Sequence, residues 1–194
     1  MGLGQFASLL EADNTSLFPP ISPAEALQAL KKMDQVSAPA PDGVGRNVLL
    51  MWDKKGEKLA NLFNAIMYSG RLLRCLKQSR TTLIPKSSDQ SKAGDINNWL
   101  LIGSVVLRAF LRVLTMRLTE ACAIHPRQRG FTEAPGCSEN LAILDGLILV
   151  SKSQRKTLAV VFMDLTKAFH TVSHKHIAEV FERRGVDELI RGLI

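Results

Sequence analysis

One carboxylate, Asp164, directly follows an apolar run and is the residue of this sequence best placed for chemistry. The run from Leu158 to Met163 is short and rich in β-forming residues, and it begins after Lys156-Thr157, which predicts a strand buried on both faces. A carboxylate at the end of such a strand faces a cleft, where oxygen ligands can hold a divalent cation. We therefore predict that Asp164 is a metal ligand.

The residues after Asp164 leave alternatives open. Lys167 is compatible with solvent exposure or with contact to a phosphate, and Phe169 with a core position or with a ligand. An amphipathic helix is predicted to follow from His174, with Ile177 and Val180 on its apolar face.

The string DLTKAFHTVSH, residues 164–174, resembles the first palm motif of reverse transcriptases. It is closest to the non-LTR retrotransposon enzymes that insert into ribosomal RNA genes, whose usual form is D-x-x-K-A-F-D-T-V-S-H. His170 stands where those enzymes carry a second Asp. The resemblance implies an RNA-directed DNA polymerase that uses Mg²⁺, with Asp164 as catalytic metal ligand and Leu165 and Phe169 at the incoming nucleotide. Phe169 would exclude a 2′ hydroxyl, and Lys167 would contact the template–primer.

A second segment resembles the fingers hairpin of the same family. Residues 81–86 (TTLIPK) predict a strand, a polar loop follows from Ser87 to Asn98, and the chain returns at Trp99. In the family, the lysine corresponding to Lys86 and an arginine after the tryptophan face the triphosphate. Here the sequence reads NWLLIGS against N-W-R-P-I-S-I-G-S, so it is two residues shorter and lacks that arginine. Loss of a charged hydrogen bond costs roughly 1.5–3 kcal/mol.

Two weaker matches lie in the family's order. Residues 37–44 (SAPAPDGV) resemble S-A-P-G-P-D-G-I, with Ala40 at the glycine. Gln128 to Phe131 resembles Q-x-G-F, a segment near the template, which implies contacts from Arg129 and Phe131. Without the resemblance, a buried Phe131 and a solvated Arg129 explain these residues equally well.

The predicted elements are mostly helical. Ser22, Pro23 and Glu25 form a capping-box start for a helix that ends near Asp34. Further helices are predicted over 45–78, with Gly70 ending one segment, and over 104–122, 138–150, 174–184 and 187–194. We predict an α/β (α+β) chain with a partial right-hand polymerase fold. Residues 1–21 form a loose lead-in, 22–155 a helix-rich fingers-like region, and 156–194 the start of a truncated palm with its first strand.

Composition supports an acidic partner without proving one. The chain has 194 residues, 46% of them hydrophobic, and a net charge of +7, which suits nucleic acid but also a merely basic surface. Three widely spaced cysteines argue against a disulfide framework or a zinc site. The N-terminus does not resemble a signal peptide, and no run is long enough to span a membrane. We expect an intracellular, reducing compartment, nuclear or cytoplasmic, and no membrane partner.

Two functions from different classes remain. The first is a reverse transcriptase fragment acting on an RNA template, a DNA primer and deoxynucleoside triphosphates, and inactive as this chain because no Asp-Asp pair occurs in the sequence. The second is a non-catalytic nucleic-acid-binding remnant of a retroelement. A decayed reading frame with an unstable product is a third possibility, and the oligomeric state stays open.

Overall fold

The structure is a computed structural model that describes residues 12–35, 38–84, 98–125, 128–130, 135–166 and 168–194. The chain divides into two compact units. We call Leu10–Cys122 with Phe181–Ile194 the core unit, and Ala123–Val180 with Met1–Leu9 the motif unit. Each is described by itself.

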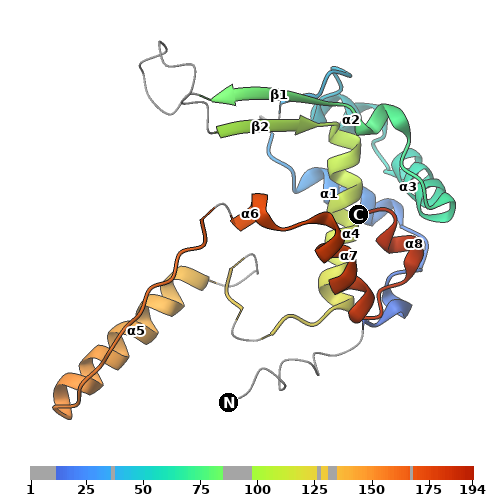
Figure 1. Cartoon of the computed structure of the whole chain (residues 1–194). Coiled ribbons are helices and arrows are strands. Elements are labelled where there is room, and N and C mark those ends of the chain that lie inside the picture. The colour runs from blue at the N-terminus through green and yellow to red at the C-terminus, as the bar shows by residue number, and fades with distance from the viewer. Residues whose placement is uncertain (1–11, 36–37, 85–97, 126–127, 131–134, 167) are drawn as a thin grey trace. The chain divides into compact units, whose positions relative to one another are not determined.

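Helices dominate the described residues (Figure 1). Their bounds are α1 Pro23–Lys31, α2 Arg46–Trp52, α3 Glu57–Ser69, α4 Val105–Ala121, α5 Gly136–Ser153, α6 Ala168–Thr171, α7 His174–Arg183 and α8 Glu188–Arg191, with 3₁₀ turns η2 Asn14–Ser16 and η3 Arg74–Lys77. The strands are β1 Ser79–Ile84 and β2 Asn98–Gly103. The expectation of a mixed α/β chain is confirmed at this level, and the predicted helix over 45–78 is divided into α2, α3 and η3.

Helix α1 packs against α3 and α4 to form the heart of the core unit. Phe63 of α3 and Phe110 of α4 are both fully buried, and their rings lie 5.4 Å apart in a tilted arrangement. Ile190 and Leu193, from the far end of the chain, are buried in the same cluster. Apolar residues of α1, α3, α4 and α8 therefore meet in one core.

The start of α1 is the predicted capping box. The Ser22 hydroxyl accepts a hydrogen bond from the Glu25 N–H at 3.2 Å, and the Ser22 N–H donates to the Glu25 carboxylate at 3.0 Å. Pro23 occupies the first helical turn, where its missing N–H costs nothing. This prediction is confirmed.

A single buried arginine joins α4 to the start of α1 and to the segment before it. Arg117 donates through Nε and Nη2 to the two Glu25 carboxylate oxygens, each at 2.9 Å. Its Nη1 donates to the carbonyls of Leu17 at 3.1 Å and Pro19 at 2.6 Å. Burial, the largest single influence, raises the pKa of Glu25, but hydrogen bonds from Arg117 and Ser22 and the Arg117 charge outweigh it and lower that pKa.

Part of the segment expected to be a loose lead-in, residues 12–21, is anchored to this core. The Asn64 side-chain amide donates to the Ile21 carbonyl at 3.0 Å and accepts from the Ile21 N–H at 2.6 Å. Asn14 likewise donates to the Gly185 carbonyl at 2.7 Å and accepts from the Asp187 N–H at 3.2 Å. Prolines signal a break in regular structure, but these long-range amide contacts hold the backbone in place.

The joint between α2 and α3 requires a glycine. Gly56 has φ +77°, and a Cβ there would lie 2.3 Å from the Pro23 carbonyl oxygen of α1. Buried Asp53, at the end of α2, accepts a hydrogen bond from the Leu59 N–H at 2.8 Å and so caps α3. The joint lets α3 approach α1 closely.

The predicted hairpin is present in the core unit. Strands β1 and β2 pair antiparallel, with Ser79 opposite Gly103 and Ile84 opposite Asn98. Lys86 and the loop lie outside the described residues. The six-residue strand β2 pairs along its whole length, so the shortened sequence after Trp99 is compatible with strand pairing.

The strand predicted over Leu158–Met163 is wrong for this chain. Residues 156–165 form no strand in the structure, and Val161, Phe162 and Met163 are 82%, 82% and 90% exposed. A β-strand forms only beside a partner that takes its backbone hydrogen bonds, and among the described residues none pairs with this segment. An apolar run in the sequence predicts a preference for burial, but burial as a strand also requires an adjacent strand.

Candidate functional site

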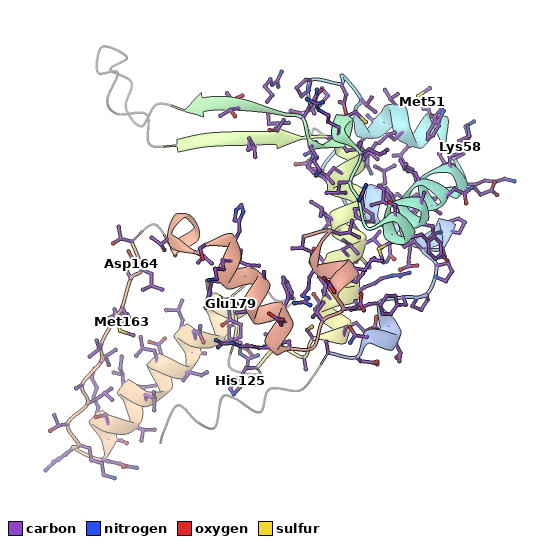
Figure 2. The ribbon with its side chains drawn as sticks, turned by 45° about the vertical axis from the view of Figure 1, so that its right-hand side comes forward. Met51, Lys58, His125, Met163, Asp164 and Glu179 are labelled. Carbon is purple, nitrogen blue, oxygen red and sulfur yellow. The ribbon has the colours of Figure 1, made fainter. Side chains whose placement is uncertain are left out.

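The predicted metal ligand, Asp164, lies on the exposed segment that precedes α6 in the motif unit. Figure 2 shows Met163 and Asp164 next to each other on this segment. Asp164 itself is exposed, and the following Leu165 is 77% exposed. The carboxylate is therefore accessible to a partner.

A tight reversal after α5 directs the chain towards Asp164. Arg155 adopts the left-handed region at φ 51°, and its N–H donates to the Lys152 carbonyl at 3.2 Å. The Lys156 N–H donates to the Ser151 carbonyl at 2.9 Å, while the Ser151 hydroxyl donates to the Lys156 carbonyl. From there residues 156–165 run back alongside α5 in both views (Figures 1 and 2).

The side of α5 that carries Leu144, Ile148 and Ser151 is its less exposed side. The remaining apolar residues of α5 stay open, including Leu141 at 61% and Leu149 at 66% exposure. The motif unit thus presents two apolar surfaces, one on α5 and one on the segment before Asp164.

The described residues do not complete a Mg²⁺ site. Magnesium takes an octahedron of oxygen ligands, usually from more than one carboxylate together with substrate or water. Within the part of the chain that the structure describes, no three His, Cys, Asp or Glu side chains gather as a possible metal group. Asp187, a carboxylate of the core unit, caps α8 by accepting from the Leu189 N–H at 2.8 Å. Asp164 can supply one ligand only.

The other predicted site residues divide into three groups. Lys86, Lys167 and Phe131 lie outside the described residues, and so does the side chain of Phe169, whose backbone belongs to α6. Leu165 is exposed beside Asp164. Arg129 is described, and it is engaged with another side chain.

Arg129 and the start of α5 form a close pair. The Arg129 Nε lies 3.2 Å from the Glu139 carboxylate, and both side chains are roughly one-third to two-fifths exposed, at 34% and 41%. A Cβ on Gly136 would lie 2.4 Å from the Arg129 carbonyl oxygen, so glycine is needed where α5 begins. The arginine predicted to contact the template thus also has an internal, structural partner.

Sequence reasoning missed that several arginines hold the core unit together. Arg46 donates to the carbonyls of Leu30 and Lys31, both at 3.0 Å, and so caps the end of α1. Arg108 of α4 donates through Nη2 to the Ala38 carbonyl at 2.9 Å. For Arg117 a signal existed, because it follows Val113 and Leu114 at helical spacing on the buried stripe of α4.

Comparison with known proteins agrees with the sequence resemblance. The family model described as "Reverse transcriptase (RNA-dependent DNA polymerase)" matches residues 84–194, which include Asp164.

Among the described residues, no helix has the length and apolar character needed to cross a membrane.

Curated relatives come from retrotransposable elements. The chain is 33% identical over 189 residues to a "Retrovirus-related Pol polyprotein from type-1 retrotransposable element R2" of Nasonia vitripennis, covering 96% of this chain and 18% of that protein. It is 34% identical over 166 residues to the R2 protein of the same description from Popillia japonica, covering 84% and 22%. The R2DM polyprotein of Drosophila melanogaster is 28% identical over 149 residues, covering 77% and 14%.

The chain therefore spans about a fifth of the length of these first two relatives. The resemblance to non-LTR retrotransposon enzymes is confirmed by the relatives, and the family match covers more than half of the residues. The chain belongs to the reverse transcriptase (RNA-dependent DNA polymerase) family.

Proposed function

We propose that this chain provides the fingers and the opening palm segment of an RNA-directed DNA polymerase encoded by a non-LTR retrotransposon. Residues 22–155 form the fingers-like region and 156–194 begin the palm of a right-hand polymerase fold. The substrates are an RNA template, a DNA primer and deoxynucleoside triphosphates. The observation that carries the proposal is that the family match over 84–194 contains Asp164 at the palm motif.

The exposed apolar run before Asp164 supports this assignment. Val161, Phe162 and Met163 together present a surface that a soluble protein normally covers, and their β-forming character suits a central strand. Neighbouring palm strands would pair with this run and exclude water from it. Asp164 would then lie at the end of a buried strand, as its sequence predicts.

In the completed fold, Asp164 contributes one of the oxygen ligands that hold the divalent cations of nucleotidyl transfer. Carboxylates from outside these residues must supply the others, because the described residues provide no further group. Lys86 contacts the triphosphate, and Leu165 and Phe169 lie beside the nucleotide. The 194-residue chain by itself is expected to synthesise no DNA.

The test begins with the coding DNA downstream of codon 194. Where it continues open and encodes an aromatic-x-Asp-Asp motif, the longer product is expressed and assayed for Mg²⁺-dependent extension of a DNA primer on RNA. We expect extension by the longer protein, loss of extension in its Asp164→Ala variant, and none with the 194-residue chain. Equal extension by the Asp164→Ala variant would overturn the assignment of that residue.

A second candidate function is a non-catalytic nucleic-acid-binding remnant. It is favoured by the missing arginine after Trp99 together with the single carboxylate at the motif. RNA binding by a longer product that never extends a primer, under conditions where a positive-control polymerase does, would support this alternative.

A further inference from the structure

A row of cations with one aromatic residue at its head runs from the end of α3 to β1. Every third residue from position 68 belongs to it, and we call this set the basic row: Tyr68, Arg71, Arg74, Lys77 and Arg80. The residues between them are apolar, small or polar and uncharged, and no Asp or Glu occurs in the sequence between Glu57 and Asp89. The local charge is thus entirely positive.

All five side chains of the basic row are exposed, and Tyr68 is 74% exposed. Among the described residues, none of its four cations makes an ion pair. This distinguishes the row from Arg46, Arg108 and Arg117, whose guanidinium groups bind carbonyl or carboxylate oxygens within the core unit. Within the part of the chain that the structure describes, the positive charge of the row is therefore not paired with an acidic side chain.

The backbone beneath the basic row is fixed. Gly70 ends α3 at φ 61°, with its N–H donating to the Ile66 carbonyl at 3.0 Å. Leu76 is only 8% exposed and belongs to the hydrophobic core, so it anchors η3. In a 3₁₀ helix, residues three apart lie on the same side, about 6 Å apart along the axis. Arg74 and Lys77, the first and last residues of η3, are therefore exposed on the same side of it.

We propose that the basic row binds a single-stranded nucleic acid, with its cations on successive phosphates and Tyr68 stacked on a base. Single-strand-binding surfaces combine a cationic track with aromatic side chains, because any base offers a face for stacking. The basic row, with an exposed tyrosine and four exposed cations within residues 68–80, meets both requirements. The partner named by this inference, single-stranded RNA, rests on the proposed function, although the row precedes the part of the chain that the family model matches.

The experiment is a fluorescence-anisotropy titration of the 194-residue chain with a labelled oligo(U) RNA at several salt concentrations. For single strands, each phosphate contact adds about 0.7 to the slope of log K against log salt. The variant Arg74→Ala/Lys77→Ala is expected to weaken binding and to flatten the slope by about 1.4. The charge-conserving variant Arg74→Lys/Lys77→Arg should keep the slope.

Tyr68→Ala has a different expected signature. Loss of one stacked base weakens binding about tenfold, while the salt slope stays unchanged because tyrosine carries no charge. The matched control is Lys54→Ala/Lys55→Ala, which removes the same charge from two exposed lysines before α3 and should leave the slope near the wild-type value. Far-UV melting verifies that each variant is folded.

Three results would overturn the inference: no RNA binding by the wild-type chain at low salt, equal flattening by the Lys54/Lys55 control, or a Tyr68→Ala variant with wild-type affinity. Binding to phosphatidylserine vesicles that depends on the row, without row-dependent RNA binding, would also overturn it and assign the surface to membranes. The Asp164→Ala variant is expected to bind RNA with wild-type affinity. A failed primer-extension test would therefore count against the proposed function but not against RNA binding by the basic row.

Discussion

The core unit and the motif unit are both rich in apolar residues, but they use them in opposite ways. In the core unit, Phe63 and Phe110 are fully buried, and Asn64 and Arg117 satisfy backbone groups across long sequence separations. In the motif unit, Phe162 is 82% exposed, although it lies in an equally apolar run. Burial of an apolar segment therefore depends on whether other segments pack against it. Among the described residues, such packing partners are present for the core unit and absent for the run that contains Phe162.

The strongest test of this comparison is a pair of phenylalanine substitutions. Phe63→Ala should lower the free energy of unfolding by about 3–5 kcal/mol, because it leaves a cavity in a packed core. Phe162→Ala should change it by less than about 0.5 kcal/mol, since the side chain is exposed. Urea denaturation measures both, and a large loss from Phe162→Ala would show that the motif unit is packed after all.

A second pair compares arginines on one helix. Arg117→Ala should cost about 3 kcal/mol of unfolding free energy, because it leaves Glu25 and several lead-in carbonyls without their donor. Arg112→Ala, which removes an exposed charge from α4, should cost less than about 0.5 kcal/mol. Similar losses of unfolding free energy in the two variants would contradict the inference that Arg117 connects α4 to α1 and to the segment before α1.

The ion pair between Arg117 and Glu25 should make the stability of the core unit depend on pH. Because the pKa of Glu25 is lowered on folding, its contribution to stability is present above the unfolded pKa and disappears as pH falls through the folded pKa. The wild-type protein should therefore lose stability below about pH 4.5 more steeply than Arg117→Ala. Unfolding free energies measured across this range would show parallel curves if the pair were unimportant.

Alanine substitutions at two glycines with positive φ distinguish the cost of backbone strain from the cost of a steric clash. Gly56→Ala should destabilise the core unit by about 2–3 kcal/mol, because left-handed strain of about 1–2 kcal/mol is joined by a clash with the Pro23 carbonyl. Gly43→Ala has a similar φ of +69° but nothing within 4 Å, so only the strain should remain. Equal effects in thermal melts would mean that α1 moves aside easily.

The smallest effect concerns the thiols. Burial raises the pKa of Cys122, with a partial offset from the charge and hydrogen bond of Arg184, while Cys75 and Cys137 are exposed. At pH 8 a thiol reagent such as DTNB should modify the two exposed cysteines quickly and Cys122 only slowly, until denaturant is added. Uniform reaction of all three would show that the core unit opens readily.

Local sequence signals predicted the elements that depend on neighbours close in the chain. The capping box at Ser22, the glycine end of α3 and the β1–β2 hairpin follow from hydrogen bonds and backbone preferences within a few residues, and the structure contains them. Features that depend on distant partners were missed. Arg117 contacts Glu25 across 92 positions in the sequence. No strand among the described residues pairs with the segment before Asp164.

The site followed the same rule. The motif predicted the family, because the spacing of residue types is itself local information, and the role of Asp164 stays a prediction. It did not predict that the carboxylate would be exposed, because exposure depends on which other segments pack against it. It also did not predict that the Arg129 guanidinium lies 3.2 Å from the Glu139 carboxylate.

The amide of Asn14 bridges the carbonyl of Gly185 and the N–H of Asp187, and Ile190 and Leu193 are buried beside helices formed from residues far earlier in the chain. During translation, the helices up to α4 leave the ribosome well before residues 181–194, which pack against them. Until Leu193 has emerged, the apolar core residues that it covers stay exposed on the nascent chain, so the core unit can close only late in synthesis.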